Sequence, residues 1–195
     1  MQKKFAKSQL MPHYSKLLNS HETATEMKPT LVSMFDYKAW ANQLLLSSLH
    51  DLAAQITVDR YRQILAIYDH AQVVDAIFQA HLQIKPHAWR DTQSTTLPSL
   101  TELKQSITAC DAWYCDFVGK LSEADLAEVR HFKFTDGLPG SMSVQEILWH
   151  VLSHAAYHRG SMAQILEDLG FASPADSLSK FLHYTQTQRR RGTPA

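Results

Sequence analysis

Apolar side chains recur at three- and four-residue steps in four long segments of the chain, a spacing typical of amphipathic helices. The first predicted helix runs from Thr30, which can serve as its N-cap, to about Leu52. The second runs from about Asp59 to Ile84, and Pro86 stops it because proline cannot continue a helix.

Two more long helices are predicted in the second half of the chain. Ser99 or Thr101 starts the third, which ends around Leu121. The fourth is opened by Ser143, because Glu146 follows it three residues later in the pattern of a capping box.

The fourth helix is predicted to run to Leu169, with Gly170 as its C-cap residue. Ahead of it, the segment 131–143 (HFKFTDGLPGSMS) carries two glycines and a proline, which predicts a loop in which a short hairpin can form. One further short helix is predicted over about 175–184.

These elements predict an all-α fold, a four-helix bundle with a short C-terminal helix. We expect an N-terminal extension over 1–29 with a short helix near 14–18, the bundle over 30–185, and a basic flexible tail over 186–195. The tail contains the chain's one basic run, Arg189–Arg191.

The composition excludes several function classes. With 195 residues the chain suits a single domain, and Lys plus Arg equals Asp plus Glu at 19 each, so no net charge draws it to nucleic acid or to a membrane surface. It has neither an apolar run long enough to span a bilayer nor the apolar stretch of a signal peptide, so we expect a cytoplasmic protein. Cys110 and Cys115 lie five apart on one predicted helix, where their side chains diverge, and we expect both to be free thiols.

Three histidines in the fourth helix, at four-residue intervals, need a chemical reason. A helix turns about 100° per residue, which places His154 and His158 inside the apolar seam and His150 about 40° outside His154, on its flank. Two imidazoles one turn apart are the usual way for a helix to offer two nitrogens to one metal ion. The intervening residues lack the glutamate of a zincin protease, so that function is rejected.

A third ligand has to come from a facing helix, and the second helix offers His70 and His81 on its apolar stripe. They are eleven residues apart, about 16 Å along a helix, so both cannot reach one ion. The central position of His70 favours it, although spacing leaves both open. The alternative is that these histidines are satisfied core or boundary residues without a metal.

The chain resembles the DinB/YfiT-like superfamily of metal-binding four-helix bundles. The segment 31–49 carries the aromatic–x–x–Trp–Ala–Asn signature of the opening helix at 37–42. The segment 64–82 (ILAIYDHAQVVDAIFQAHL) resembles the second helix, with a histidine after an apolar run, and 143–170 resembles the last helix with its H-x-x-x-H-R-G pattern.

The resemblance implies that His70, His154 and His158 hold a divalent transition metal, zinc or nickel, and that His81 and His150 do not. Three nitrogen donors also suit these ions better than magnesium or calcium. The superfamily often has glutamine after H-R-G, where this chain has Ser161, which puts any role of that glutamine in doubt here.

The resemblance also implies a small-molecule thiol as partner and a homodimer as assembly. We expect a metal-dependent S-transferase or related detoxifying enzyme, in which an open metal position lowers the pKa of a thiol such as bacillithiol, mycothiol or glutathione before it attacks an electrophile. The alternatives are a non-enzymatic, metal-stabilised stress-response or binding protein, and a plain bundle without metal. Tyr157 and Arg159 are expected to point away from the seam and to have structural or rim roles.

Overall fold

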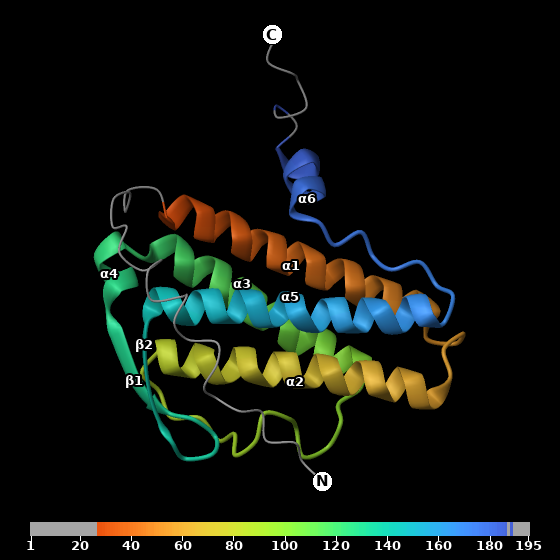
Figure 1. The fold of residues 1–195 in the computed structure, drawn as a ribbon, viewed down its shortest axis with the longest axis horizontal. Helices are drawn as coiled ribbons and strands as arrows, with labels where there is room; N and C mark the ends of the chain where they lie inside the picture. The colour runs from red at the N-terminus through yellow and green to blue at the C-terminus, as the bar shows by residue number, and fades with distance from the viewer. Residues whose placement is uncertain (1–26, 187, 189–195) are drawn as a thin grey trace, which may run out of the picture.

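The computed structural model describes residues 27–186 and 188, so residues 1–26 of the expected extension, with its short helix near 14–18, and the basic run lie outside the described residues. Four long helices lie alongside one another (Figure 1): α1 (Met27–Leu52), α2 (Val58–Leu82), α3 (Leu100–Lys120) and α5 (Val144–Asp168). α1 packs mainly against α3, and α2 mainly against α5. The predicted all-α four-helix bundle is confirmed, including the short C-terminal helix α6 (Leu178–Thr185). Within the described part of the chain, no helix combines the length and apolar character that crossing a bilayer requires.

The helix starts test the predicted caps. Ser99 is the N-cap of α3 and forms a reciprocal capping box with Glu102, which decides between the two predicted starts. The capping box of Ser143 and Glu146 at the start of α5 is confirmed. The prediction that Thr30 caps the first helix was wrong, because α1 already begins at Met27 and Thr30 lies inside it.

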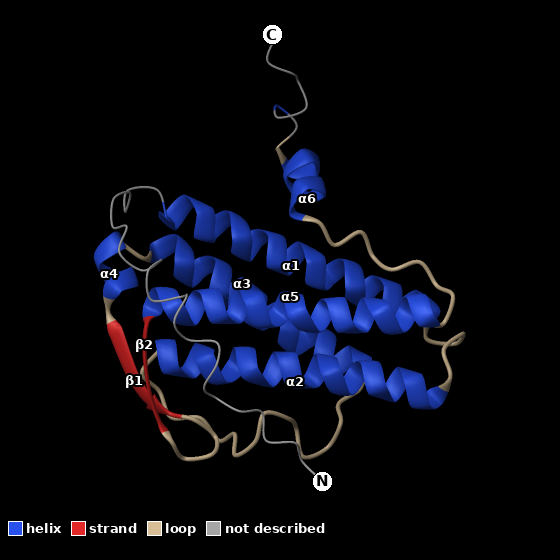
Figure 2. Ribbon diagram, viewed as in Figure 1, coloured by secondary structure: helices blue, strands red, loops and turns tan. Residues whose placement is uncertain are grey.

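The segment between α3 and α5 contains more structure than the sequence pattern predicted. A five-residue helix, α4 (Glu123–Ala127), was missed, because so short an element shows no apolar periodicity. The hairpin is present: β1 (Val129–Lys133) pairs antiparallel with β2 (Pro139–Ser143), as Figure 2 shows. β2 leads directly into α5, so the hairpin fixes where that helix begins.

The core consists of two apolar clusters, one toward each end of the bundle. Phe35 and Leu148 belong to the cluster nearer α4, and Leu46 and Ile165 belong to the other. Between the positions that these clusters occupy in α1 lies the buried Lys38, which is only 2% exposed. A polar layer therefore separates the two apolar clusters.

Two carboxylates compensate the buried charge of Lys38. Its Nζ lies 2.7 Å from Asp75 Oδ2 on α2 and 2.5 Å from Asp111 Oδ1 on α3. Asn42 donates to the second Asp111 oxygen at 2.8 Å. Although burial acts in the opposite direction, the two carboxylates raise the pKa of Lys38 above its usual value, so this side chain is a buried ammonium.

Main-chain geometry at the end of α2 is unusual. Ile84 has a φ of 55°, in the left-handed region that disfavours a β-branched residue by about 1–2 kcal/mol. The amide of Lys85 donates to the carbonyl of Ala80 at 2.9 Å, the bond of a helix-terminating motif in which glycine usually occupies this position. The Ile84 side chain is 76% exposed, so packing does not offset this cost.

Replacing Lys38 by methionine should leave the Asp75 and Asp111 carboxylates buried without a counter-charge. We expect Lys38→Met to lower the free energy of unfolding at pH 7 by about 3–5 kcal/mol, measured by urea denaturation. The matched control is Lys120→Met, whose ion pair with Asp116 is largely exposed and should contribute less than about 1 kcal/mol. Losses of the same small size in both variants would contradict a stabilising role for the buried pair.

Candidate metal centre

Three histidine rings converge between α2 and α5. Nε2 of His154 lies 3.2 Å from Nε2 of His70 and 3.1 Å from Nε2 of His158. The candidate ligand atoms of all three lie within 4.8 Å of one another, and they are the one group of three or more potential metal ligands found among the described residues. The structure thus brings together the three residues that the sequence analysis selected.

Helix geometry explains how the cluster forms. His154 and His158 are one turn apart on α5, so both side chains project from the same side of the helix. His70 comes from the middle of α2, which lies beside α5 (Figure 1). All three side chains are half-buried, whereas the position of His154 and His158 in the seam had indicated buried side chains.

A loop hydrogen bond orients His70. Its Nδ1 lies 2.9 Å from the carbonyl oxygen of Thr92, in the loop between α2 and α3, and must donate to it. The neutral ring therefore carries no proton on Nε2, whose lone pair is directed at the cluster. Nδ1 of His154 is buried and has no hydrogen-bond partner among the described residues, so packing rather than a hydrogen bond orients that ring.

Asp69 holds the loop that carries Thr92. It is buried beside His70, and its two carboxylate oxygens accept hydrogen bonds from the amide of Ser94 at 2.8 Å and from the Ser94 hydroxyl at 2.6 Å. Asp69, Thr92 and Ser94 were not predicted from the sequence as part of the site. The one local signal was a carboxylate next to a histidine, because the loop contact itself joins residues 25 apart.

The nitrogen spacing fits a transition-metal ion. Zinc–nitrogen distances are about 2.0–2.1 Å, so two imidazole nitrogens on one tetrahedral ion lie roughly 3.3 Å apart. The two Nε2 separations of 3.2 and 3.1 Å are close to this value. Without a cation, a single proton can join one of these nitrogen pairs but not both, which leaves lone pairs facing each other. An all-imidazole set suits zinc or nickel and not magnesium or calcium.

The environment favours the neutral form of His154 and His158. Burial, followed by the neighbouring rings of His158, His70 and His150, lowers the pKa of His154 to about 3. Burial and then His70 also lower the pKa of His158. Because a metal ion binds only the neutral imidazole, these nitrogens are available as ligands at pH 7.

The other two candidate histidines lie outside the cluster. His150 is on its flank, as predicted, with its ring centroid 5.4 Å from that of His154 and 4.6 Å from that of Phe78. His81 stacks on Phe132 of the hairpin, at a centroid distance of 4.2 Å. The choice that spacing left open, between His70 and His81, is thus decided by the packing of α2 against α5.

Arg159 and Tyr157 differ in their surroundings although both flank His158. Tyr157 is exposed at the rim, as expected. Arg159 is buried, and its Nε donates to Asp176 at 2.7 Å, so the expectation that it points away from the core was wrong. The seam had been placed from the apolar residues of this helix alone, whereas α5 packs against both α2 and α1. The Ser161 hydroxyl donates to the carbonyl of Tyr157 at 3.1 Å, a bond within its own helix.

The two cysteines are free thiols, as predicted, Cys110 buried and Cys115 half-buried. Burial is the main factor that raises the pKa of each thiol to about 12. Neither is a reactive thiolate at neutral pH.

The lowered pKa of His154 predicts a pH dependence of the metal-free protein. Its folded pKa of about 3 lies below the unfolded value of about 6.5. The unfolded state therefore binds more protons between these values, so the stability present above pH 6.5 is lost as the pH falls toward 3. With EDTA present, His154→Phe should show a smaller fall in urea midpoint between pH 7 and pH 4 than the parent. His50→Gln, at an exposed side chain of α1, is the control, and a parent-like fall in His154→Phe would contradict the prediction.

Comparison with known proteins agrees with this arrangement. The sequence matches the DinB family over residues 24–191. Protein DinB of Bacillus subtilis (strain 168) is 23% identical over 171 residues, which cover 80% of this chain and 95% of that protein. The family match includes all four bundle helices and both segments that carry the histidine cluster. The chain therefore belongs to the DinB family.

Proposed function

We propose that this protein binds a zinc or nickel ion through His70, His154 and His158 and uses it as a metal-dependent thiol S-transferase. The observation that carries the proposal is the convergence of three imidazole nitrogens with no fourth candidate ligand in the group, among the described residues. Structural zinc sites usually have four protein ligands, whereas catalytic sites have three and leave a position for a water or a substrate.

Each part of the site has a defined task in this proposal. A bound ion would supply Lewis acidity that lowers the pKa of a thiol. The three imidazoles hold the ion, and the Thr92 carbonyl keeps the proton of His70 on Nδ1, away from the ion. Asp69 holds the loop of Thr92 in place through Ser94, and Tyr157 lies exposed beside His158, where a substrate would approach.

A second function, a metal-stabilised binding protein without catalysis, is favoured by one observation. A cavity lined by Ala155 and Arg159, the residues that follow His154 and His158 in the sequence, has a volume of about 10 Å³, and none of the three histidines lines it. This is room for about one water molecule and not for a substrate. A thiol and an electrophile would therefore have to reach the ion from the solvent side.

Metal content tests the ligand assignment. Protein purified without a nickel column should contain about one zinc or nickel ion per chain by elemental analysis. His154→Ala should lose most of it, because two imidazoles bind far more weakly than three. The matched control is His150→Ala, one turn away on the same helix, which should keep its metal. Unchanged metal in His154→Ala, or an equal loss in His150→Ala, would contradict the assignment.

Turnover distinguishes the enzyme from the binding protein. With glutathione or bacillithiol and 1-chloro-2,4-dinitrobenzene, a new sulfur–carbon bond forms while the carbon–chlorine bond breaks, and the thiol proton leaves with chloride. The metal-loaded protein should accelerate this reaction, followed by absorbance, and His154→Ala should be slower by tenfold or more. If a range of thiols and of chlorinated and epoxide electrophiles gives no rate above that of metal-free protein, the binding function is favoured.

A further inference from the structure

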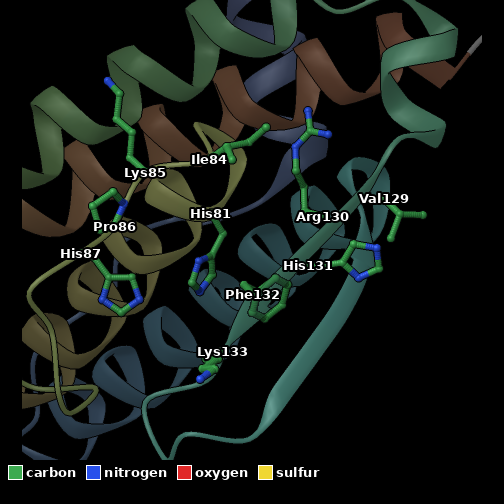
Figure 3. Close-up of a pocket in the computed structure, with 10 residues that line it drawn as sticks. All are labelled: His81, Ile84, Lys85, Pro86, His87, Val129, Arg130, His131, Phe132 and Lys133. Carbon is green, nitrogen blue, oxygen red and sulfur yellow. The ribbon is translucent and has the colours of Figure 1, made fainter.

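A second concave site lies about 16 Å from His70 along α2, counted at 1.5 Å per residue to His81. It is a cavity of about 670 Å³ between the C-terminal end of α2, the segment 84–87 and β1 (Figure 3). This volume is within the range of small-molecule sites in proteins, about 300–1,000 Å³. None of the lining residues belongs to the histidine cluster.

Ile84 forms an apolar part of the rim of this cavity, although its backbone conformation is unfavourable. It has the left-handed φ described above, where glycine would be favoured, and its side chain is 76% exposed beside the cavity. A disfavoured backbone conformation that keeps a large apolar side chain in solvent suggests that the side chain contacts something outside the chain.

The inner side of β1 supplies unpaired polar groups. Arg130 alternates with the exposed Val129 and His131 and is only 16% exposed on its side chain. Its Nη1 donates to Glu128 at 2.8 Å, whereas its Nε is buried with no partner among the described residues. Nδ1 of His87, across the cavity, is also buried without a partner there. Figure 3 shows Arg130, Ile84 and His87 around the stacked rings of His81 and Phe132.

The charges of the residues that line the cavity indicate that a suitable ligand is negatively charged. Lys85, Arg130 and Lys133 line the cavity, and none of its lining residues in the described chain is acidic. The whole protein has no net charge, so this excess of positive charge is local. A metal cation is disfavoured here, although two histidines are adjacent, because the nearby ammonium and guanidinium groups repel it.

We infer that this cavity binds a small organic carboxylate with a flat apolar body. The carboxylate pairs with the guanidinium group of Arg130, in the planar geometry that guanidinium groups favour, and accepts a hydrogen bond from the ring of His87. The apolar body lies against Phe132 and beneath the Ile84 side chain. Burial and the neighbouring His87 lower the pKa of His81 to about 4, so its ring is neutral at pH 7 and adds to the apolar surface.

The test uses the full chain and naphthalene-2-carboxylate as the probe, with its neutral carboxamide for comparison. The carboxylate should shift backbone amide signals of 81–87 and 129–133 in NMR spectra, with zinc present or absent, and the carboxamide should bind about tenfold more weakly. Binding of both compounds with equal affinity, shifts confined to other residues, or no shift at millimolar carboxylate would overturn the inference.

Four variants assign the contacts. Arg130→Gln should weaken carboxylate binding about tenfold, whereas Arg62→Gln, at an exposed position on α2, should not change it.

Glu128→Gln should strengthen carboxylate binding several-fold because it releases the guanidinium group of Arg130 from its ion pair. Ile84→Gly should weaken binding about threefold and yet raise the urea midpoint, since glycine accepts the left-handed conformation. Parent-like binding in Arg130→Gln, or in a more stable Ile84→Gly, would overturn the assignment.

Discussion

The buried charge of Lys38 constrains the whole bundle. An ammonium removed from water has to be compensated, and here the carboxylates come from two different helices, Asp75 on α2 and Asp111 on α3. A rotation or a one-turn shift of α1, α2 or α3 would leave at least one charge buried and unpaired. Apolar side chains tolerate such rearrangements far better, because their attraction has no direction. The polar layer therefore selects one register among the packings that the apolar clusters allow.

The candidate metal centre depends on that register. His70 lies five residues before Asp75 on α2, so the ion pair that positions Asp75 also determines the height of His70 against α5. Asp69 positions the loop between α2 and α3, because its contacts with Ser94 place the Thr92 carbonyl beside Nδ1 of the His70 ring. The neighbouring residues Asp69 and His70 of α2 thus have different roles. His70 presents a nitrogen to the cluster, and Asp69 holds the loop whose carbonyl orients the His70 ring. Ile84, just after the C-terminal end of α2, lowers local stability instead. Its backbone is in the disfavoured left-handed region, and its apolar side chain is exposed to solvent.

The sequence was most informative where interactions are local. The periodicity of apolar residues placed the long helices to within a few residues of their ends, and the capping box of Ser143 placed the start of α5. The separation of His150 from His154 and His158 followed from the helical repeat alone. Errors came from contacts between distant segments. Arg159 was expected to point away from the apolar seam, but it is ion-paired to Asp176, which lies 17 residues later in the chain. No local pattern predicted that Lys38 is buried and paired, since its partners are remote in the chain.

The amino-acid sequence by itself determined the four long helices, the capping box that opens the last of them and the pairing of His154 with His158, because each depends on residues within one or two helical turns. The resemblance to a family then selected His70. Only the tertiary structure decided that His70 reaches His154 across 84 residues of chain and that Thr92 fixes the position of its proton. It also decided that Lys38 is paired within the core. These outcomes depend on which helix faces meet, and a period of 3.6 residues specifies a face without specifying its neighbour.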